Sequence, residues 1–126
     1  SLRRALSMLE AGGVGLQKAV SDILDVLPAR DVAAIHRLAD RVSGPGTDDA
    51  FGLLSDLVFD WLSRKVRAEA AAGVPAAALA GWAEVWEKTG QAIGSAEALN
   101  LDRKQVVLNL FQDIAEVDRT ARARAS

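Results

Sequence analysis

The sequence predicts an all-α protein that folds as a single helical bundle of about five or six helices. Apolar residues recur three or four positions apart in nearly every segment, which is the spacing of one buried helix face. Glycine and proline fall between these segments, where they end one helix and let the next begin. No segment alternates apolar and polar residues beside hairpin turn residues, so we expect no sheet.

The first third of the chain carries three helical patterns. The opening segment, SLRRALSML, has apolar residues at helical spacing, and Gly12 and Gly13 are expected to end that helix. The second pattern stops at Pro28, and Asp31 is placed to cap the third. The apolar positions of the three patterns are Leu2, Ala5, Leu6 and Leu9; Leu16, Val20, Ile23, Leu24 and Leu27; and Val32, Ile35, Leu38, Ala39 and Val42.

The segment SGPGTDD is the clearest loop and marks the start of a long helix. Thr47 is placed as the N-cap, and two aspartates follow in the first turn, where the helix dipole favours negative charge. Gly73 follows this helix, and Pro75 begins the next at a position where a missing N–H costs nothing. The expected buried residues are Phe51, Leu54, Leu57, Val58, Trp61, Leu62 and Val66 in the first helix and Leu79, Trp82, Val85, Trp86 and Ile93 in the second.

Asp102 and Gln105 mark the start of the last helix, because their D-x-x-Q spacing is a variant of the capping box. The apolar residues of this helix spread over a wide arc. One stripe consists of Val106, Leu110, Ile114 and Val117, and a second consists of Val107 and Phe111. One stripe can face the bundle and the other a partner, so we predict a partner interface at Val107 and Phe111. Residues 119–126 are polar, small and basic, and we expect them to fray.

The three tryptophans, Trp61, Trp82 and Trp86, all continue apolar helix faces. Exposed rings would form an aromatic docking face, whereas a buried ring would remove about 150–250 Å² from water. Their place in periodic apolar stripes favours the core for all three. Buried indole N–H groups then need acceptors.

Composition limits the function classes. The 126 residues suit one domain, and half of them are apolar. A formal net charge of −2 gives no electrostatic reason to bind nucleic acid or an anionic membrane. The chain has no cysteine, which excludes thiolate catalysis and cysteine–zinc sites and makes a cytoplasmic setting the expectation. No run of about 18 apolar residues predicts a membrane span.

No motif for catalysis or nucleotide binding is found. His36 is the only histidine, and we expect it at the surface of a short helix, because metal ligands come in clusters. The GPG at 44–46 lacks the lysine and hydroxyl residue of a phosphate loop. The basic residues at 64–67 and 103–104 are too few to indicate nucleic-acid binding. We therefore expect no catalytic residue, metal, cofactor or small-molecule substrate.

Two stretches, one at each end of the chain, resemble segments of a known family. SLRRALSML resembles the sensor-2 helix in the lid of clamp-loader AAA+ proteins, written G-S-x-R-x-A-L. The matching residues are Ser1, Leu2, Arg3, Ala5 and Leu6, with Arg3 at the arginine position. Further along, WAEVWEK and then ALNLDRKQVVLNLF resemble the C-terminal helices of the delta-prime family of bacterial DNA polymerase III subunits. The middle of the chain matches only as a helical pattern.

The resemblance implies a division of the chain. Residues 1–13 would be the terminal helix of an AAA+ lid, and residues 14–126 a collar-type helical bundle, with the AAA+ core in a preceding part of a longer subunit. Arg3 would occupy the sensor-2 position, which contacts nucleotide phosphates in ATP-binding relatives through its planar fork. Delta-prime subunits commonly lack a working ATP site, and the resemblance then implies that Arg3 is a relic or a structural residue.

The function implied is non-catalytic oligomerisation. Collar domains form a ring that holds a clamp-loader pentamer together while the sliding clamp is opened and placed on primed DNA. The implied partners are the gamma/tau and delta subunits, with DNA and the clamp reached only through the full complex. Three alternatives stay open: a free-standing helical regulator or adaptor that homodimerises, a small all-helical enzyme, and a direct DNA-binding module.

Overall fold

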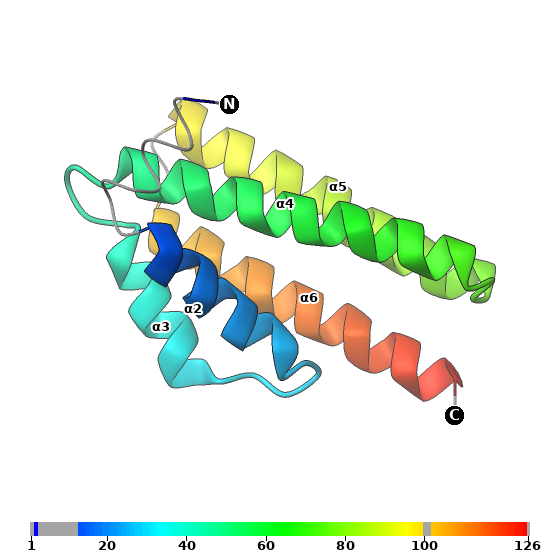
Figure 1. Ribbon diagram of the computed structural model, residues 1–126. Coiled ribbons are helices and arrows are strands. Elements are labelled where there is room, and N and C mark those ends of the chain that lie inside the picture. Colours follow the sequence, from blue (N-terminus) through cyan, green and yellow to red (C-terminus); the bar gives the residue numbers. More distant parts are fainter. Residues whose placement is uncertain (1, 3–12, 100–101, 126) are drawn as a thin grey trace.

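A computed structural model describes residues 2, 13–99 and 102–125 (Figure 1). Within these residues there are five helices and no strand, so the predicted all-α bundle is confirmed for the described chain. The helices are α2 (Gly13–Asp25), α3 (Val32–Arg41), α4 (Asp48–Ala71), α5 (Ala76–Leu99) and α6 (Arg103–Ala125). Gly13 begins α2, which corrects the prediction that it ends an earlier helix. The segment that carries Arg3 lies outside the described residues.

The five helices pack in a closed ring, in which each has two main neighbours. The order around the ring is α4, α5, α6, α3, α2 and back to α4. The long helices α4 and α6 run in one direction and α5 in the other, whereas the shorter α2 and α3 cover only one end (Figure 1). We call this the five-helix end. The opposite end, at the α4–α5 turn, is the three-helix end.

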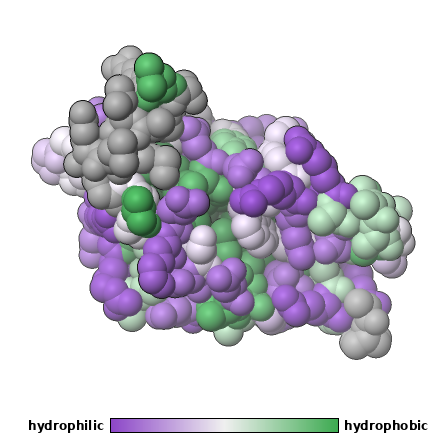
Figure 2. All heavy atoms as spheres, viewed as in Figure 1, coloured by the Kyte–Doolittle hydropathy of each residue, from purple (hydrophilic) through white to green (hydrophobic). Residues whose placement is uncertain are grey.

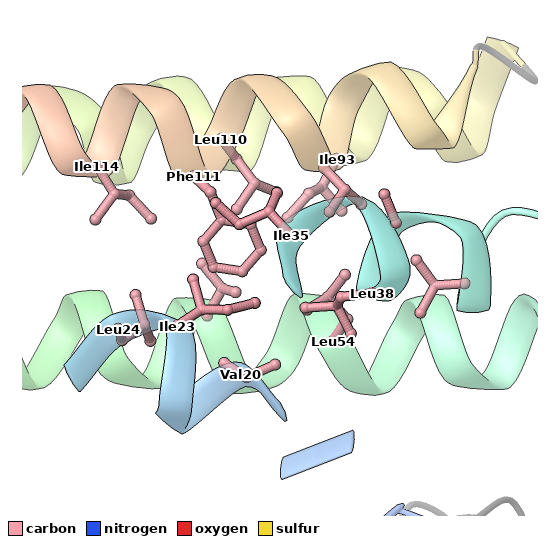
Figure 3. Packing of buried hydrophobic residues seen from close by; sticks show 14 of the residues in the cluster. Val20, Ile23, Leu24, Ile35, Leu38, Leu54, Ile93, Leu110, Phe111 and Ile114 are labelled. Atoms are coloured by element: carbon pink, nitrogen blue, oxygen red, sulfur yellow. The ribbon is translucent and has the colours of Figure 1, made fainter. Parts of the chain in front are cut away.

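Core side chains come from all five helices. Figure 3 shows Ile23 of α2, Leu38 of α3 and Leu54 of α4 converging with Phe111 of α6. Burial fades toward the three-helix end, because no residue of α4 beyond Leu62 is buried and no described residue of α6 beyond Asp118 is buried. The core is therefore concentrated where α2 and α3 close the bundle.

Two aspartates cap helices as predicted. Asp31 Oδ1 accepts a backbone N–H at 3.1 Å at the start of α3. Asp102 Oδ1 accepts the N–H of Lys104 at 3.0 Å at the start of α6. Gln105 does not complete the predicted capping box, because its side chain donates to Asn109 one turn along at 2.9 Å. The start of α6 therefore relies on Asp102 alone.

The ends of α4 lie where the sequence predicts them. Thr47 holds the N-cap position, but its hydroxyl donates back to the Gly44 carbonyl and accepts no N–H of the helix. At the other end Gly73 has a φ of 71°, and its N–H and that of the next residue bond carbonyls of the last turn at 3.2 and 3.3 Å. This hydrogen-bond pattern is a Schellman motif, which ends the helix and turns the chain toward α5.

The helix α6 continues to Ala125 and so includes most of the segment 119–126 that we expect to fray. Alanine and arginine, which fill this segment, are strong helix formers. Arg122 Nε also pairs with Asp118 Oδ2 at 2.6 Å, one turn earlier. Positive charge in the last turn is further favoured by the helix dipole.

Candidate interaction surfaces

The α6 stripe that was predicted to face a partner lies in the core. Val107 is 0% exposed and Phe111 is 1% exposed. In Figure 3 the Phe111 ring points from α6 into the interior of the bundle. The predicted interface at these two residues is therefore wrong. The physical reason is that α6 packs against α5 on one side and α3 on the other, so its wide apolar arc is covered within the chain.

The basic residues at the start of α6 contact other helices. Arg103 Nη2 lies 2.7 Å from Asp48 Oδ1 of α4, and its guanidinium carbon lies 4.9 Å from the centroid of the Phe51 ring. Lys104 Nζ lies 2.7 Å from Asp40 Oδ1 of α3. These contacts join α6 to the start of α4 and the end of α3. They give both cations a structural role at the five-helix end.

Trp82 is buried as predicted. Its side chain is 0% exposed, its ring meets the half-buried Trp61 edge-on with centroids 5.8 Å apart, and Lys65 Nζ lies 5.2 Å from the ring centroid. Its Nε1–H finds no acceptor among the described residues, contrary to the expectation that a buried indole would have one. A donor left unpaired in this way lowers stability.

Trp86 does not lie in the core. It is 44% exposed, which corrects the prediction for this ring. It meets Phe59 of α4 edge-on, with centroids 6.3 Å apart and an interplanar angle of 76°. Gly90 lies against the same phenyl ring, since a Cβ there would be 3.0 Å from Phe59 Cζ. Phe59, Trp86 and Gly90 form what we call the aromatic edge, on the side of α5 that faces α4.

A groove of about 280 Å³ lies on the other side of α5, between α5 and α6. It runs from Lys88 and Asp113 toward the three-helix end, where Ala77 and Arg124 line it. The apolar lining consists of Ala77, Ala78, Gly81, Val85, Val117 and Ala121. A Cβ on Gly81 would lie 3.6 Å from Val117 Cγ1, so α5 and α6 are already in close contact beneath the groove. The groove therefore has a dense floor of small side chains.

Five charged residues border the groove. Lys88 of α5 and Asp113 of α6 pair across it, with 3.2 Å between Nζ and Oδ2. Glu84 on α5 and Glu116 on α6 are exposed, and no ion pair among the described residues involves either of them. Arg124 adds a positive charge near the end of α6. Two carboxylates on opposite walls are thus available to a partner.

Sequence analysis missed this groove, although it contains a signal. Ala78, Gly81 and Val85 repeat at helical spacing on α5, and Val117 and Ala121 do so on α6. Small residues at such spacing mark a face where another helix can come close. The pattern does not say which two helices meet, and that information comes only from the fold.

Other kinds of site find no support in the described residues. His36 is exposed, as predicted, and no group of three possible metal ligands occurs in the described part of the chain. None of the helices in residues 13–99 and 102–125 combines the length and apolar character needed to cross a membrane. Comparison with protein-family models, with curated proteins and with solved structures found no match.

Proposed function

We propose that this chain is a non-catalytic helical oligomerisation domain, and that the assembly it joins is the clamp-loader pentamer of bacterial DNA replication. The first part rests on one observation, the exposed aromatic edge around Trp86 on a bundle whose other aromatic residues are buried or half-buried. Tryptophan is enriched among the residues that dominate protein-interface energetics. An exposed ring held by two long helices suits such an anchor.

The second part rests on the sequence resemblance to clamp-loader subunits. The stretch ALNLDRKQVVLNLF resembles the delta-prime family, in which a short loop leads into a long helix. Here Asp102 caps the long helix α6 within that stretch, and the two cations after it join α6 to α4 and α3. These contacts are compatible with a collar role, in which a rigid bundle presents its faces to neighbouring subunits.

The proposed partners are the collar domains of the gamma/tau and delta subunits. DNA and the sliding clamp would be reached only through the complete loader. A stable interface of this kind buries on the order of 1,200–2,000 Å² in total. The aromatic edge would lie at the centre of one such interface, where water is excluded and tryptophan contributes most.

The test is size-exclusion chromatography with light scattering on this chain, alone and mixed with collar fragments of the clamp-loader partners. We expect a defined hetero-complex and a monomeric isolated chain. Trp86→Ala should weaken the complex by about tenfold or more. The control is Val26→Ala, which truncates an exposed apolar residue in the loop after α2.

A different result would favour the adaptor alternative. A stable homodimer that binds no collar partner would replace the clamp-loader proposal with an independent, self-associating helical protein. If the hetero-complex forms but Trp86→Ala binds as tightly as Val26→Ala, the aromatic edge is not the anchor. Circular dichroism on both variants checks that the bundle is intact.

A further inference from the structure

We propose that the groove between α5 and α6 binds a helix of a neighbouring subunit that carries a lysine or arginine between small apolar residues. This inference rests on the proposed function and deepens it. The groove would be a second docking surface, separate from the aromatic edge. The proposal also specifies the chemistry of the partner helix that the groove would bind.

The size of the groove favours an inserted side chain. At about 280 Å³ it is at or below the lower end of the 300–1,000 Å³ that small-molecule pockets typically span. Its floor of alanine, glycine and valine has no long side chain that would hold a partner backbone away. A helix lying along α5 and α6 can therefore approach closely and place one long side chain between the walls.

The charges on the walls favour a cation. Lys88 and Asp113 neutralise each other, which leaves Glu84 and Glu116 without an ion pair among the described residues. A lysine or arginine in the groove would be attracted to both carboxylates. Arg124 also lines the groove and would repel a cation. We therefore expect the partner's lysine or arginine to lie near Glu84, away from Arg124.

The place of the groove fits assembly in a ring. It lies on the side of α5 that faces α6, whereas the aromatic edge lies on the side that faces α4. A subunit inside a ring meets its two neighbours through two different surfaces, while a two-fold dimer needs only one surface that matches itself. The aromatic edge is aromatic, whereas the groove has small side chains on its floor and carboxylates on its walls. The groove should therefore meet the neighbour that the aromatic edge does not.

The experiment measures the dissociation constant of this chain for each collar partner by isothermal titration calorimetry. The variant is Glu84→Lys/Glu116→Lys, tested also as its two single substitutions, and the control for each single substitution is Glu87→Lys, which reverses an exposed charge on α5 outside the groove. We expect the double variant to bind one partner about tenfold or more weakly, and the control to bind like the wild type. Trp86→Ala should weaken binding to the other partner. Added salt should weaken wild-type binding more than binding by the double variant.

Three outcomes would overturn the proposal. If the wild type binds the partners and the double variant matches Glu87→Lys, the groove is not a docking site, although the proposed function stands. If the wild type binds no collar partner, the proposed function fails and this inference fails with it. If the wild type self-associates and the double variant is monomeric, the occupant is a second copy of this chain. Thermal unfolding of each variant confirms that all are folded.

Discussion

The two ends of the bundle share the three long helices but are stabilised by different means. At the five-helix end, side chains of all five helices belong to the same core cluster as Phe111, and ion pairs from Arg103 and Lys104 join α6 to α4 and α3. At the three-helix end, the turn between α4 and α5 is rich in exposed alanine, which appears as the pale hydrophobic tip in Figure 2. This difference shows that α2 and α3 complete the core at the five-helix end. The end they leave uncovered has exposed small residues and ion pairs between successive turns of one helix, such as Arg122 with Asp118.

The sharpest test of this comparison removes one apolar side chain from each end. Phe111→Ala should lower the free energy of unfolding by about 3–5 kcal/mol, because it deletes a fully buried ring among well-packed neighbours. Val117→Ala, a half-buried residue beside the groove, should cost about 1 kcal/mol. Urea denaturation measures both values. Equal losses would mean that the two ends are packed alike.

A second prediction concerns the last buried residue of α6. The Asp118 side chain is 5% exposed and pairs with Arg122, which is 60% exposed. Arg122→Ala should lower stability by about 1–3 kcal/mol, because it leaves a buried carboxylate without its charged partner. Adding Asp118→Asn to this variant should recover part of the loss. If Arg122→Ala is neutral in urea denaturation, this ion pair does not stabilise the three-helix end.

Arg103 at the five-helix end should have a smaller effect. Its partner Asp48 is 84% exposed, so solvent screens that ion pair, whereas its contact with the Phe51 ring is largely shielded. Arg103→Ala should cost about 1 kcal/mol and Asp48→Ala less than about 0.5 kcal/mol. Thermal unfolding at low and high salt distinguishes the two contributions. Equal, salt-sensitive losses would show that the ion pair dominates.

The last prediction concerns the sign of the stability change at two glycines. Gly73→Ala should cost about 1 kcal/mol, because a φ of 71° is unfavourable for a residue with a Cβ. Gly94→Ala, inside α5 with nothing within 4 Å of the new Cβ, should instead stabilise by about 0.5–1 kcal/mol. The same substitution thus shifts the unfolding midpoint in opposite directions. Two shifts of the same sign would contradict the assigned turn geometry.

Local features of the fold could be predicted from the sequence. Asp31, Thr47 and Asp102 each precede a helix as their residue types and positions indicate, and Gly73 ends α4. These signals depend on hydrogen bonds within a few residues, so a single sequence contains them. The fold class follows from the same spacing of apolar residues.

Features that depend on which helices meet could not be predicted. Val107 and Phe111 lie on an apolar arc wider than one helix neighbour can cover, and periodicity does not tell a second neighbour in the same chain from a partner. Trp86 continues an apolar stripe, yet it is 44% exposed. Phe59 of α4 contacts the Trp86 ring edge-on, and this contact does not cover the whole ring. The groove is a further case, since Lys88 and Asp113 come together only through the packing of α5 on α6.

The ring order of the helices also bears on how the protein is made. The helix α6 follows the other four in the chain, yet it is the neighbour of both α5 and α3. The ribosome needs roughly 1–5 s to add the 23 residues of α6 at ordinary rates of synthesis. During this time the apolar faces of α3 and α5 are not covered by α6. Ile35 and Leu38 on α3, and Val85 on α5, are then open to chaperones. Apolar surface exposed during this interval is prone to aggregation until the ring closes.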